Sequence, residues 1–339
     1  MSAPSAAIYG WRKPDLDAEA AVFFRTANPW GFILFAEACV SRAQVRRLVE
    51  SLWDAVGREA LVFIDQEGGR VARLKPPEWP VFPAAARFGA LYKRAPEAGL
   101  DACRLNHRLI AHELAALGVR ADCAPVLDLP AEGADPIIGD RAFGTEPADI
   151  AALGRAALEG MAEGGVAGVI KHIPGHGRAD ADSHLALPRV KVGKQALSLD
   201  FACFKALADA PMAMTAHVLY EAYDPVEPAT TSPILINLIR TEIGFDGLLM
   251  TDDLGMKALN GSWAEKAARS FAAGCDVALH CSGDMAEMRA LAEAIPPLSG
   301  KALDRAAHAD AAVATPKPFD AAEGWHRLRA LMSEGAALA

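Results

Sequence analysis

The chain has 339 residues, of which 52% are hydrophobic and 23% are charged. This composition provides for a sizeable core and excludes an intrinsically disordered chain. The formal net charge of −9 argues against a nucleic-acid partner, because such binding depends on clustered lysines and arginines that displace counterions from phosphates.

Short apolar runs bounded by Gly, Pro or Asp alternate with amphipathic stretches along the chain. In chain order the apolar runs predict strands at residues 31–35, 61–65, 118–126, 167–171, 212–217, 247–251 and 277–281. Apolar residues at three- and four-residue spacing predict helices at residues 42–56, 100–117, 147–163, 194–208 and 263–273. The stretch from about residue 303 to 339 is typical of closing helices.

This alternation of strands and helices predicts an α/β fold. Continuously apolar strands indicate a parallel sheet that helices cover on both faces. Seven or eight such units favour a single TIM-type (β/α)8 barrel, and we expect residues 1–339 to form one domain. A doubly wound open sheet is the alternative, but the chain lacks the GxGxxG pattern that opens a dinucleotide-binding unit.

Polar side chains gather where the predicted strands end. The residues are Asp65 after LVFI, Lys171 and His172 after AGVI, His217 after MAMTA, and Asp252 and Asp253 after GLLMT. The catalytic groups of a barrel collect at the C-terminal ends of its strands, so these residues predict a functional site there.

The segment KHIPGHG at residues 171–177 places two histidines beside Pro and Gly, which favour a tight loop. His172 and His176 have the i, i+4 spacing of a zinc-binding helix. However, Pro174 and Gly175 oppose that helix, and no Glu follows the first His, so we expect no metal. The remaining alternative to a catalytic role is a pair of loop histidines held by backbone hydrogen bonds.

Asp182-Ser183-His184 follows this loop. A carboxylate two residues before an imidazole can hold its tautomer and stabilise its cation, which makes the pair a candidate general acid and base. Ser183 is expected to be structural, because the chain has no GxSxG elbow and three adjacent residues cannot adopt triad geometry. At the late strand, Asp252 is the candidate to face the pocket, whereas Asp253 is expected to cap a helix.

The order and spacing of these segments resemble the family 3 glycoside hydrolases, and within them the β-N-acetylglucosaminidases of peptidoglycan recycling. The resemblance covers nearly the whole chain. The matching segments are GFILF at 31–35, IDQEGGR at 64–70, APVLD at 124–128, IGDRAFG at 138–144, KHIPGHG at 171–177, DSH at 182–184, MTAH at 214–217 and MTDDL at 250–254.

The resemblance implies a TIM-type barrel and a role for each matching residue. Asp252 matches the nucleophile of the family. Asp182 and His184 match the acid/base pair that this subgroup carries on a mobile loop. The positions that hold the sugar's hydroxyl and N-acetyl groups are matched by Asp65, Arg141, Lys171 and His172.

The sequence departs from the family pattern at four places. Ala36-Glu37-Ala38 follows the early strand where relatives carry Arg-Asn, Ile173 replaces Phe, Gly255 replaces Ser, and Asp180 adds an acid beside the acid/base pair. None of these departures removes a catalytic group.

The expected reaction is a two-step displacement with retention, in which Asp252 attacks the anomeric carbon and His184 serves as acid and then as base. No metal or organic cofactor is needed. Two alternatives remain open, namely a phosphorylase that uses inorganic phosphate in place of water and a non-catalytic sugar sensor.

The expected compartment is the cytoplasm. The N-terminus lacks an export signal, no apolar run reaches the ~20 residues of a membrane span, and the six cysteines lack CxxC spacing and read as free thiols. We therefore expect a monomer without membrane or nucleic-acid partners, whose substrate is a small GlcNAc-containing muropeptide fragment.

Overall fold

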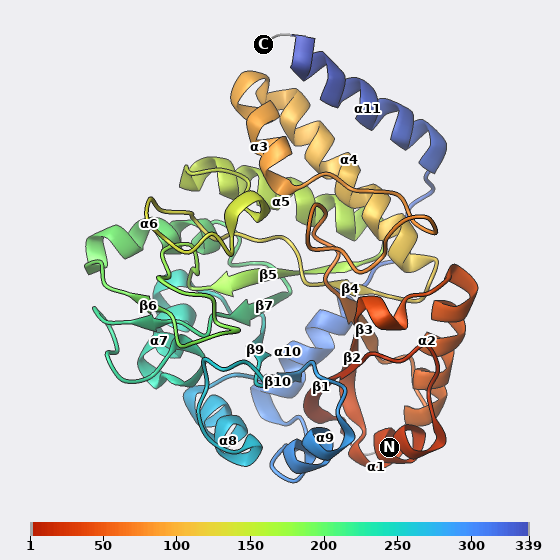
Figure 1. Cartoon of the computed structure of the whole chain (residues 1–339), viewed down its shortest axis with the longest axis vertical. Helices are drawn as coiled ribbons and strands as arrows, with labels where there is room; N and C mark the ends of the chain where they lie inside the picture. Colours follow the sequence, from red (N-terminus) through yellow and green to blue (C-terminus); the bar gives the residue numbers. More distant parts are fainter. Residues whose placement is uncertain (1–2, 338–339) are drawn as a thin grey trace.

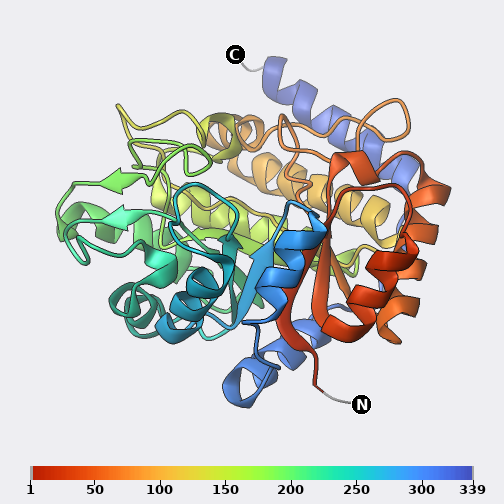
Figure 2. The same cartoon turned by 60° about the horizontal axis from the view of Figure 1, so that its bottom comes forward.

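The computed structural model describes residues 3–337, within which eight parallel strands close into a barrel in the order β1-β10-β9-β7-β5-β4-β3-β2. The barrel strands are β1 (Ser5–Trp11), β2 (Pro29–Leu34), β3 (Leu61–Ile64), β4 (Ala121–Asp122), β5 (Ala167–Ile173), β7 (Met212–Thr215), β9 (Leu248–Asp253) and β10 (Val277–His280). A two-stranded parallel sheet, β6 (Arg189–Val190) and β8 (Leu219–Tyr220), stands out to one side of the barrel (Figure 2). The predicted (β/α)8 barrel is confirmed.

Helices surround the strands (Figure 1). They are α1 (Ala18–Ala27), α2 (Arg42–Val56), α3 (Ala85–Arg94), α4 (Pro96–Ala115), α5 (Pro147–Glu163), α6 (Lys194–Lys205), α7 (Pro233–Leu238), α8 (Trp263–Ala273), α9 (Met285–Ala292), α10 (Gly300–Ala311) and α11 (Ala321–Ala337). Short helical turns form η1 (Ala36–Ala38), η2 (Gly139–Arg141), η3 (Ala229–Thr231) and η4 (Ile239–Ile243). The last helix, α11, packs along α4. Of the helices described between residues 3 and 337, none is long and apolar enough to cross a membrane.

Local sequence signals set the ends of several helices. Helix α2 begins after Ser41, whose side chain accepts a hydrogen bond from the Gln44 backbone in a capping box, and it ends at Gly57 with a φ of 69°. Ser262 and Glu265 form the same capping box at the start of α8. Helices α2, α5 and α8 have the predicted bounds.

The core has two layers, because the side chains of each strand alternate between the inside of the barrel and the surrounding helices. In β1, Ile8 packs inside the barrel with Phe63 and Met250, whereas Tyr9 packs outward among helical residues such as Phe24. The interior of the barrel is therefore a packed apolar core, and the polar groups lie at the ends of the strands.

Two strand predictions needed correction. The sequence pattern missed β1, whose SAAIYGW segment is rich in small residues and has a weak strand signal. The strand predicted at 118–126 shortens to Ala121–Asp122, since Pro125 lies just beyond it and cannot donate a backbone hydrogen bond. Without β1 the barrel would not close, because β1 pairs with both β2 and β10.

Candidate active site

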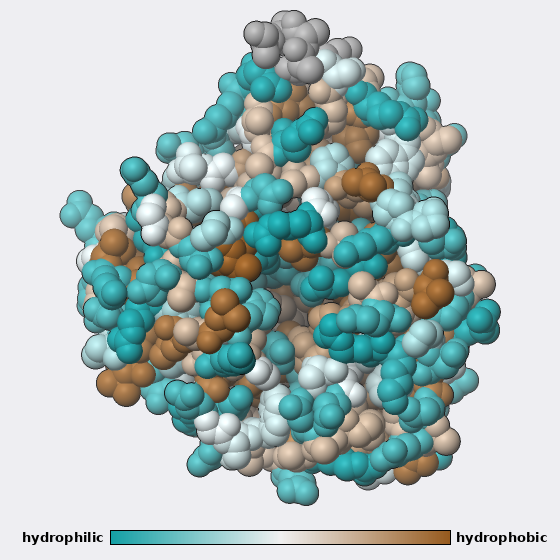
Figure 3. Space-filling model, in the orientation of Figure 1, coloured by the Kyte–Doolittle hydropathy of each residue, from teal (hydrophilic) through white to brown (hydrophobic). Residues whose placement is uncertain are grey.

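A cavity of about 450 Å³ opens at the C-terminal ends of the barrel strands. Asp65 directly follows β3, Lys171 and His172 lie in β5, and Asp252 lies in β9. These four residues line the cavity together with Arg141 and His184, and Asp182 is hydrogen-bonded to His184. The fold therefore brings all seven predicted site residues to one place. Figure 3 shows the molecule hollowed near the centre of one face, with mainly hydrophilic residues around the hollow.

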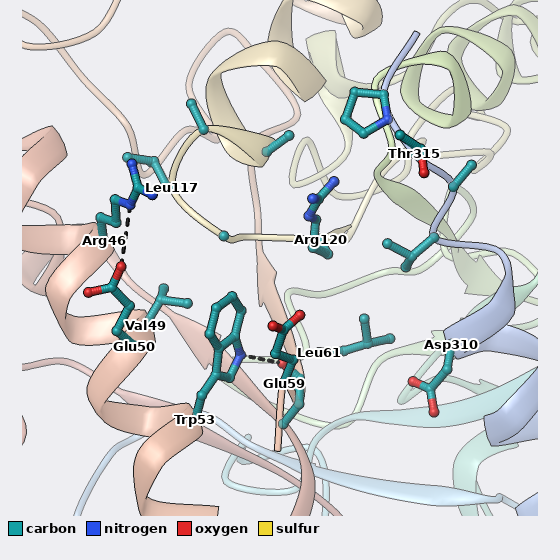
Figure 4. A pocket seen from close by; sticks show the side chains of 17 residues that line it. Arg46, Val49, Glu50, Trp53, Glu59, Leu61, Leu117, Arg120, Asp310 and Thr315 are labelled. Atoms are coloured by element: carbon teal, nitrogen blue, oxygen red, sulfur yellow. Dashed lines mark hydrogen bonds and ion pairs between the residues drawn. The ribbon is translucent and has the colours of Figure 1, made fainter. Parts of the chain in front are cut away.

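A larger cavity of about 810 Å³ lies at the opposite end of the barrel, where Leu61 begins β3 and Arg120 immediately precedes β4 (Figure 4). Its lining includes none of the seven predicted residues. Polar groups around it are engaged with the protein: Arg46 Nε lies 3.3 Å from Glu50 Oε1, and the Trp53 indole donates to a backbone carbonyl at 2.9 Å. Six of the seven predicted site residues instead line the cavity at the C-terminal end.

A chain of alternating charges forms one wall of the active-site cavity. Lys171 Nζ donates to Asp65 Oδ1 at 2.8 Å and contacts Glu67 Oε1 at 2.7 Å. Arg73 donates to the second oxygen of Asp65 at 2.9 Å, and Arg141 donates two hydrogen bonds of 2.8 Å to the Glu67 carboxylate. The Lys171 side chain is only 2% exposed. Each buried charge therefore has at least one partner of opposite sign.

The pairing determines the ionisation of this wall. Burial acts to raise the pKa values of Asp65 and Glu67, but the neighbouring cations outweigh it and hold both pKa values below their usual range. Burial acts to lower the pKa of Lys171, and the two carboxylates reverse this effect and raise it. All three groups are charged at neutral pH and present fixed donors and acceptors to a polar ligand.

Asp128 organises the KHIPGHG loop. Its Oδ2 lies 2.7 Å from His172 Nδ1, and its Oδ1 accepts hydrogen bonds from the backbone N–H groups of His172 at 3.2 Å and His176 at 2.6 Å. Burial acts to raise the pKa of Asp128, but the charges and hydrogen bonds of the two histidines outweigh it and lower this pKa to about 2. Because Nδ1 of His172 is occupied, only Nε2 remains to meet a ligand. Within residues 3–337, no three or more His, Cys, Asp or Glu side chains are grouped so as to hold a metal ion.

The Asp182–His184 pair lies on the loop after β5. Asp182 Oδ1 accepts hydrogen bonds from His184 N at 2.9 Å and lies 2.8 Å from His184 Nδ1, while the His184 side chain is 61% exposed. Burial raises the pKa of Asp182 less than the hydrogen bonds from His184 lower it. Ser183 is buried at the cavity wall, and its carbonyl accepts from Ala258 N at 3.2 Å. The loop is thus docked on the segment that follows β9.

The two adjacent acids at the end of β9 have different surroundings. Both line the cavity, but Asp252 is 7% exposed and its Oδ1 accepts from Asp253 N at 2.8 Å. Asp253 was expected to cap a helix, and this prediction was wrong, since the next helix is capped by Ser262. Asp253 Oδ1 instead accepts from Gly255 N at 2.9 Å and Cys281 N at 3.1 Å. It ties the end of β9 to the end of β10.

His217 lies two residues after the end of β7, yet it is fully buried and does not line the cavity. Its Nδ1 lies 2.7 Å from Thr230 Oγ1 and its Nε2 lies 2.9 Å from the carbonyl oxygen of Asp253. Burial lowers the pKa of His217, so the ring is neutral. This histidine supports the backbone beside Asp252.

Two departures from the family pattern have structural roles. Glu37 pairs with Arg12 at 2.7 Å, and Arg12 lines the cavity. Asp180 accepts a hydrogen bond from Arg189 N at 2.7 Å and lies 3.3 Å from Lys191 Nζ, so it is engaged with β6 and the residue beyond it.

The sequence reasoning assigned no site role to Glu67, Arg73 or Asp128. Glu67 and Asp128 lie inside the segments that carry the resemblance. Both are acids that closely follow an expected strand, and this position is the signal that could have identified them as site residues. Arg73 lies beyond its segment and had no such signal, because its contact with Asp65 depends on the turn between them.

The cavity combines an acid at the end of a barrel strand, an Asp–His pair and a polar wall. This is the arrangement expected of a glycoside hydrolase, which needs a nucleophile, a proton donor and groups that bind a sugar. The Glycosyl hydrolase family 3 N terminal domain matches residues 19–313, and the chain belongs to this family. The chain is 39% identical over 256 residues to the Beta-hexosaminidase of Thioalkalivibrio sulfidiphilus, covering 74% of this chain and 73% of that protein. It is 41% identical over 261 residues to the Beta-hexosaminidase of Alkalilimnicola ehrlichii, with the same coverages of 74% and 73%.

Solved structures agree with this assignment. NagZ from Neisseria gonorrhoeae in complex with N-trifluoroacetyl-D-glucosamine superposes with a TM-score of 0.85 at 28% identity, over 99% of this chain and 98% of that one. The family 3 β-N-acetylglucosaminidase from Paenibacillus sp. gives a TM-score of 0.80 at 30% identity, over 98% of this chain and 62% of that one. The chain is therefore a glycoside hydrolase with a saccharide substrate, as predicted.

Proposed function

We propose that this chain is a retaining exo-β-N-acetylglucosaminidase of cell-wall recycling. Its substrates would be muropeptide fragments such as GlcNAc linked to 1,6-anhydro-N-acetylmuramic acid, with or without peptide. The observation that carries the proposal is that Asp252 and His184 line one cavity with the charged wall described above. The similarity to a β-N-acetylglucosaminidase and to NagZ in complex with N-trifluoroacetyl-D-glucosamine supports GlcNAc as the sugar that is released.

In the first step, a carboxylate oxygen of Asp252 attacks the anomeric carbon and the glycosidic bond breaks. His184, as the imidazolium, gives its proton to the departing oxygen. A covalent glycosyl-aspartate results. In the second step, His184 takes a proton from water, the water oxygen attacks the anomeric carbon, and the bond to Asp252 breaks.

The geometry suits each role. Asp253 N donates to Oδ1 of Asp252, which orients the carboxylate and leaves Oδ2 for attack. Asp182 holds Nδ1 of His184, so Nε2 is the atom that carries the transferred proton. An imidazole is the side chain that can both give and take a proton near neutral pH.

The charged wall would bind the GlcNAc unit. Asp65 is assigned to accept hydrogen bonds from sugar hydroxyl groups, whereas Arg141 and Lys171 donate to its oxygens. His172 offers Nε2 to the same ligand. Because these groups are already paired and buried, they are held in place before the sugar arrives.

The test of the nucleophile is mass spectrometry after reaction with a 2-fluoro or 5-fluoro glycosyl donor. We expect the label on the peptide that carries Asp252, and we expect the Asp253→Asn variant, as a matched control, to label at the same residue. A label on any other residue, or a donor turned over without a trapped adduct, would remove the assignment. Incorporation of phosphate as a sugar 1-phosphate would instead show a phosphorylase.

We also propose that the protein meets its substrate in the cytoplasm. All six cysteines are free thiols, which supports a reducing compartment such as the cytoplasm. We expect the protein to cleave soluble anhydro-muropeptides faster than polymeric wall, and liquid chromatography of both digests measures this. A monomer remains the prediction, and the molar mass from light scattering tests it.

A further inference from the structure

One buried acid next to the active site has no role in the mechanism above. Asp122 ends β4, pairs with Ile64 of β3 and Gly168 of β5, and its side chain is completely buried. Its Oδ1 accepts a hydrogen bond from Gln66 N at 2.9 Å. Its Oδ2 is buried and has no hydrogen-bond partner.

Gln66 is the centre of the segment that carries the two carboxylates of the charged wall. Its side-chain Oε1 accepts from Arg73 N at 2.9 Å and Leu74 N at 3.0 Å, and its Nε2 donates to Leu74 O at 3.3 Å. Asp65 and Glu67 flank it in the chain. The bond from Gln66 N to Asp122 therefore anchors the backbone between these two carboxylates to the barrel.

Burial is the main reason that Asp122 favours its neutral form. Asp65 and Glu67 face it from the segment after β3, and Lys171 faces it from β5. The cations nearby already have partners. Lys171 is shared between Asp65 and Glu67, while Arg73 binds the second oxygen of Asp65 and Arg141 binds both oxygens of Glu67. A third carboxylate with a single N–H partner would be a poorly compensated buried charge, which is costly. Burial accordingly raises the pKa of Asp122 to about 7.

We propose that Asp122 is a positioning residue for sugar binding, which in its neutral form anchors Gln66 and thereby holds Asp65 and Glu67 in their binding arrangement. Ionisation of Asp122 adds a negative charge that competes for Lys171 and repels the two carboxylates. The inference rests on the proposed role of this wall in binding GlcNAc. It assigns Asp122 no contact with the substrate.

The test compares Asp122→Asn with Asp122→Ala by calorimetric binding of free GlcNAc between pH 5 and 9. The asparagine keeps an oxygen for Gln66 N but cannot ionise. We expect the Kd of the wild-type protein to rise about tenfold per pH unit once Asp122 ionises, as for any ligand that needs the protonated form. In Asp122→Asn this rise should disappear, and Asp122→Ala should bind weakly at every pH.

A second measurement separates protonation from binding. The infrared difference between the wild-type protein and Asp122→Asn should contain the C=O stretch of a protonated carboxyl group at pH 6 and lose it by pH 9. Absence of that band at pH 6, or equal pH profiles of Kd in the wild-type protein and Asp122→Asn, would overturn the inference. If Asp122→Ala does not fold, Asp122→Asn still decides. A protein that binds no GlcNAc at any pH would refute the proposed function instead, while the infrared titration would still report the state of Asp122.

Discussion

Replacing His184 with alanine tests the acid/base assignment most sharply, because the loss must depend on the leaving group. A natural sugar aglycone has a high pKa and needs the proton from His184, whereas an activated aryl aglycone leaves as a stable anion. We expect kcat/KM on a natural disaccharide to fall by ~10² to 10⁴-fold in His184→Ala. On an aryl GlcNAc glycoside, kcat/KM should fall much less.

The structure separates this effect from a folding defect. The loss on the natural substrate corresponds to about 3 to 5 kcal/mol of transition-state stabilisation. The His184 side chain is 61% exposed and its side-chain hydrogen bond is to Asp182. An exposed pair of this kind contributes about 0 to 1 kcal/mol to stability. The free energy of unfolding should therefore change far less than the activation free energy.

Leu185 provides a matched control, since it is the next residue on the same loop and is 70% exposed. Leu185→Ala removes an exposed side chain of similar size without removing a proton donor. It should leave kcat/KM on both substrates near the wild-type values, measured by disaccharide chromatography and aglycone absorbance. Equal losses on the two substrates in His184→Ala would show that this histidine is not the acid.

Three further predictions concern other residues at the active site. Asp252→Asn should abolish turnover with little change in melting temperature, which a chromogenic assay and calorimetry measure together; appreciable residual kcat would contradict the nucleophile assignment. Lys171→Met should lower stability by about 3 to 5 kcal/mol in denaturant unfolding, because it leaves two buried carboxylates without their shared cation; a change below about 1 kcal/mol would refute this reading. Since the folded state lowers the pKa of Asp128 to about 2, the stability that its ionised form supplies is present above its unfolded pKa near 3.9 and is lost as pH falls towards 2. Asp128→Asn should therefore be less stable than wild type at pH 7, and the difference should shrink as pH falls from 4 to 2; a difference that is independent of pH would count against the linkage with His172.

The location of the site could be predicted from the sequence because of a rule about parallel strands. Their C-terminal ends all meet at one end of a barrel, so a polar residue that follows an apolar run is placed there whatever the details of packing. Asp65, Lys171 and Asp252 were found in this way, although they lie in three different strand units. The bounds of α2, α5 and α8 were likewise local, since capping residues and periodic apolar positions determine them.

What the sequence could not provide is the pairing between distant segments. Lys171 and Asp65 are 106 residues apart in the chain, and their ion pair exists because β3 and β5 flank β4 in the closed barrel. The surroundings of Asp253 had the same origin. The sequence favoured Asp252 as the acid that faces the pocket, but it could not show that Asp253 also lines the cavity while it accepts a hydrogen bond from the backbone of Cys281, just beyond β10.

The residue types at the strand ends, and with them the place of a functional site, were therefore readable from local pattern alone. The class of reaction and the expected binding and catalytic roles came from the resemblance of the ordered segments to the family 3 glycoside hydrolases. The ionisation states were not readable from the sequence. These depend on burial and on charges contributed by other strands, as the neutral His217 and the buried Asp122 illustrate. A side chain's neighbours in space are determined when the barrel closes, and its pKa follows from those neighbours.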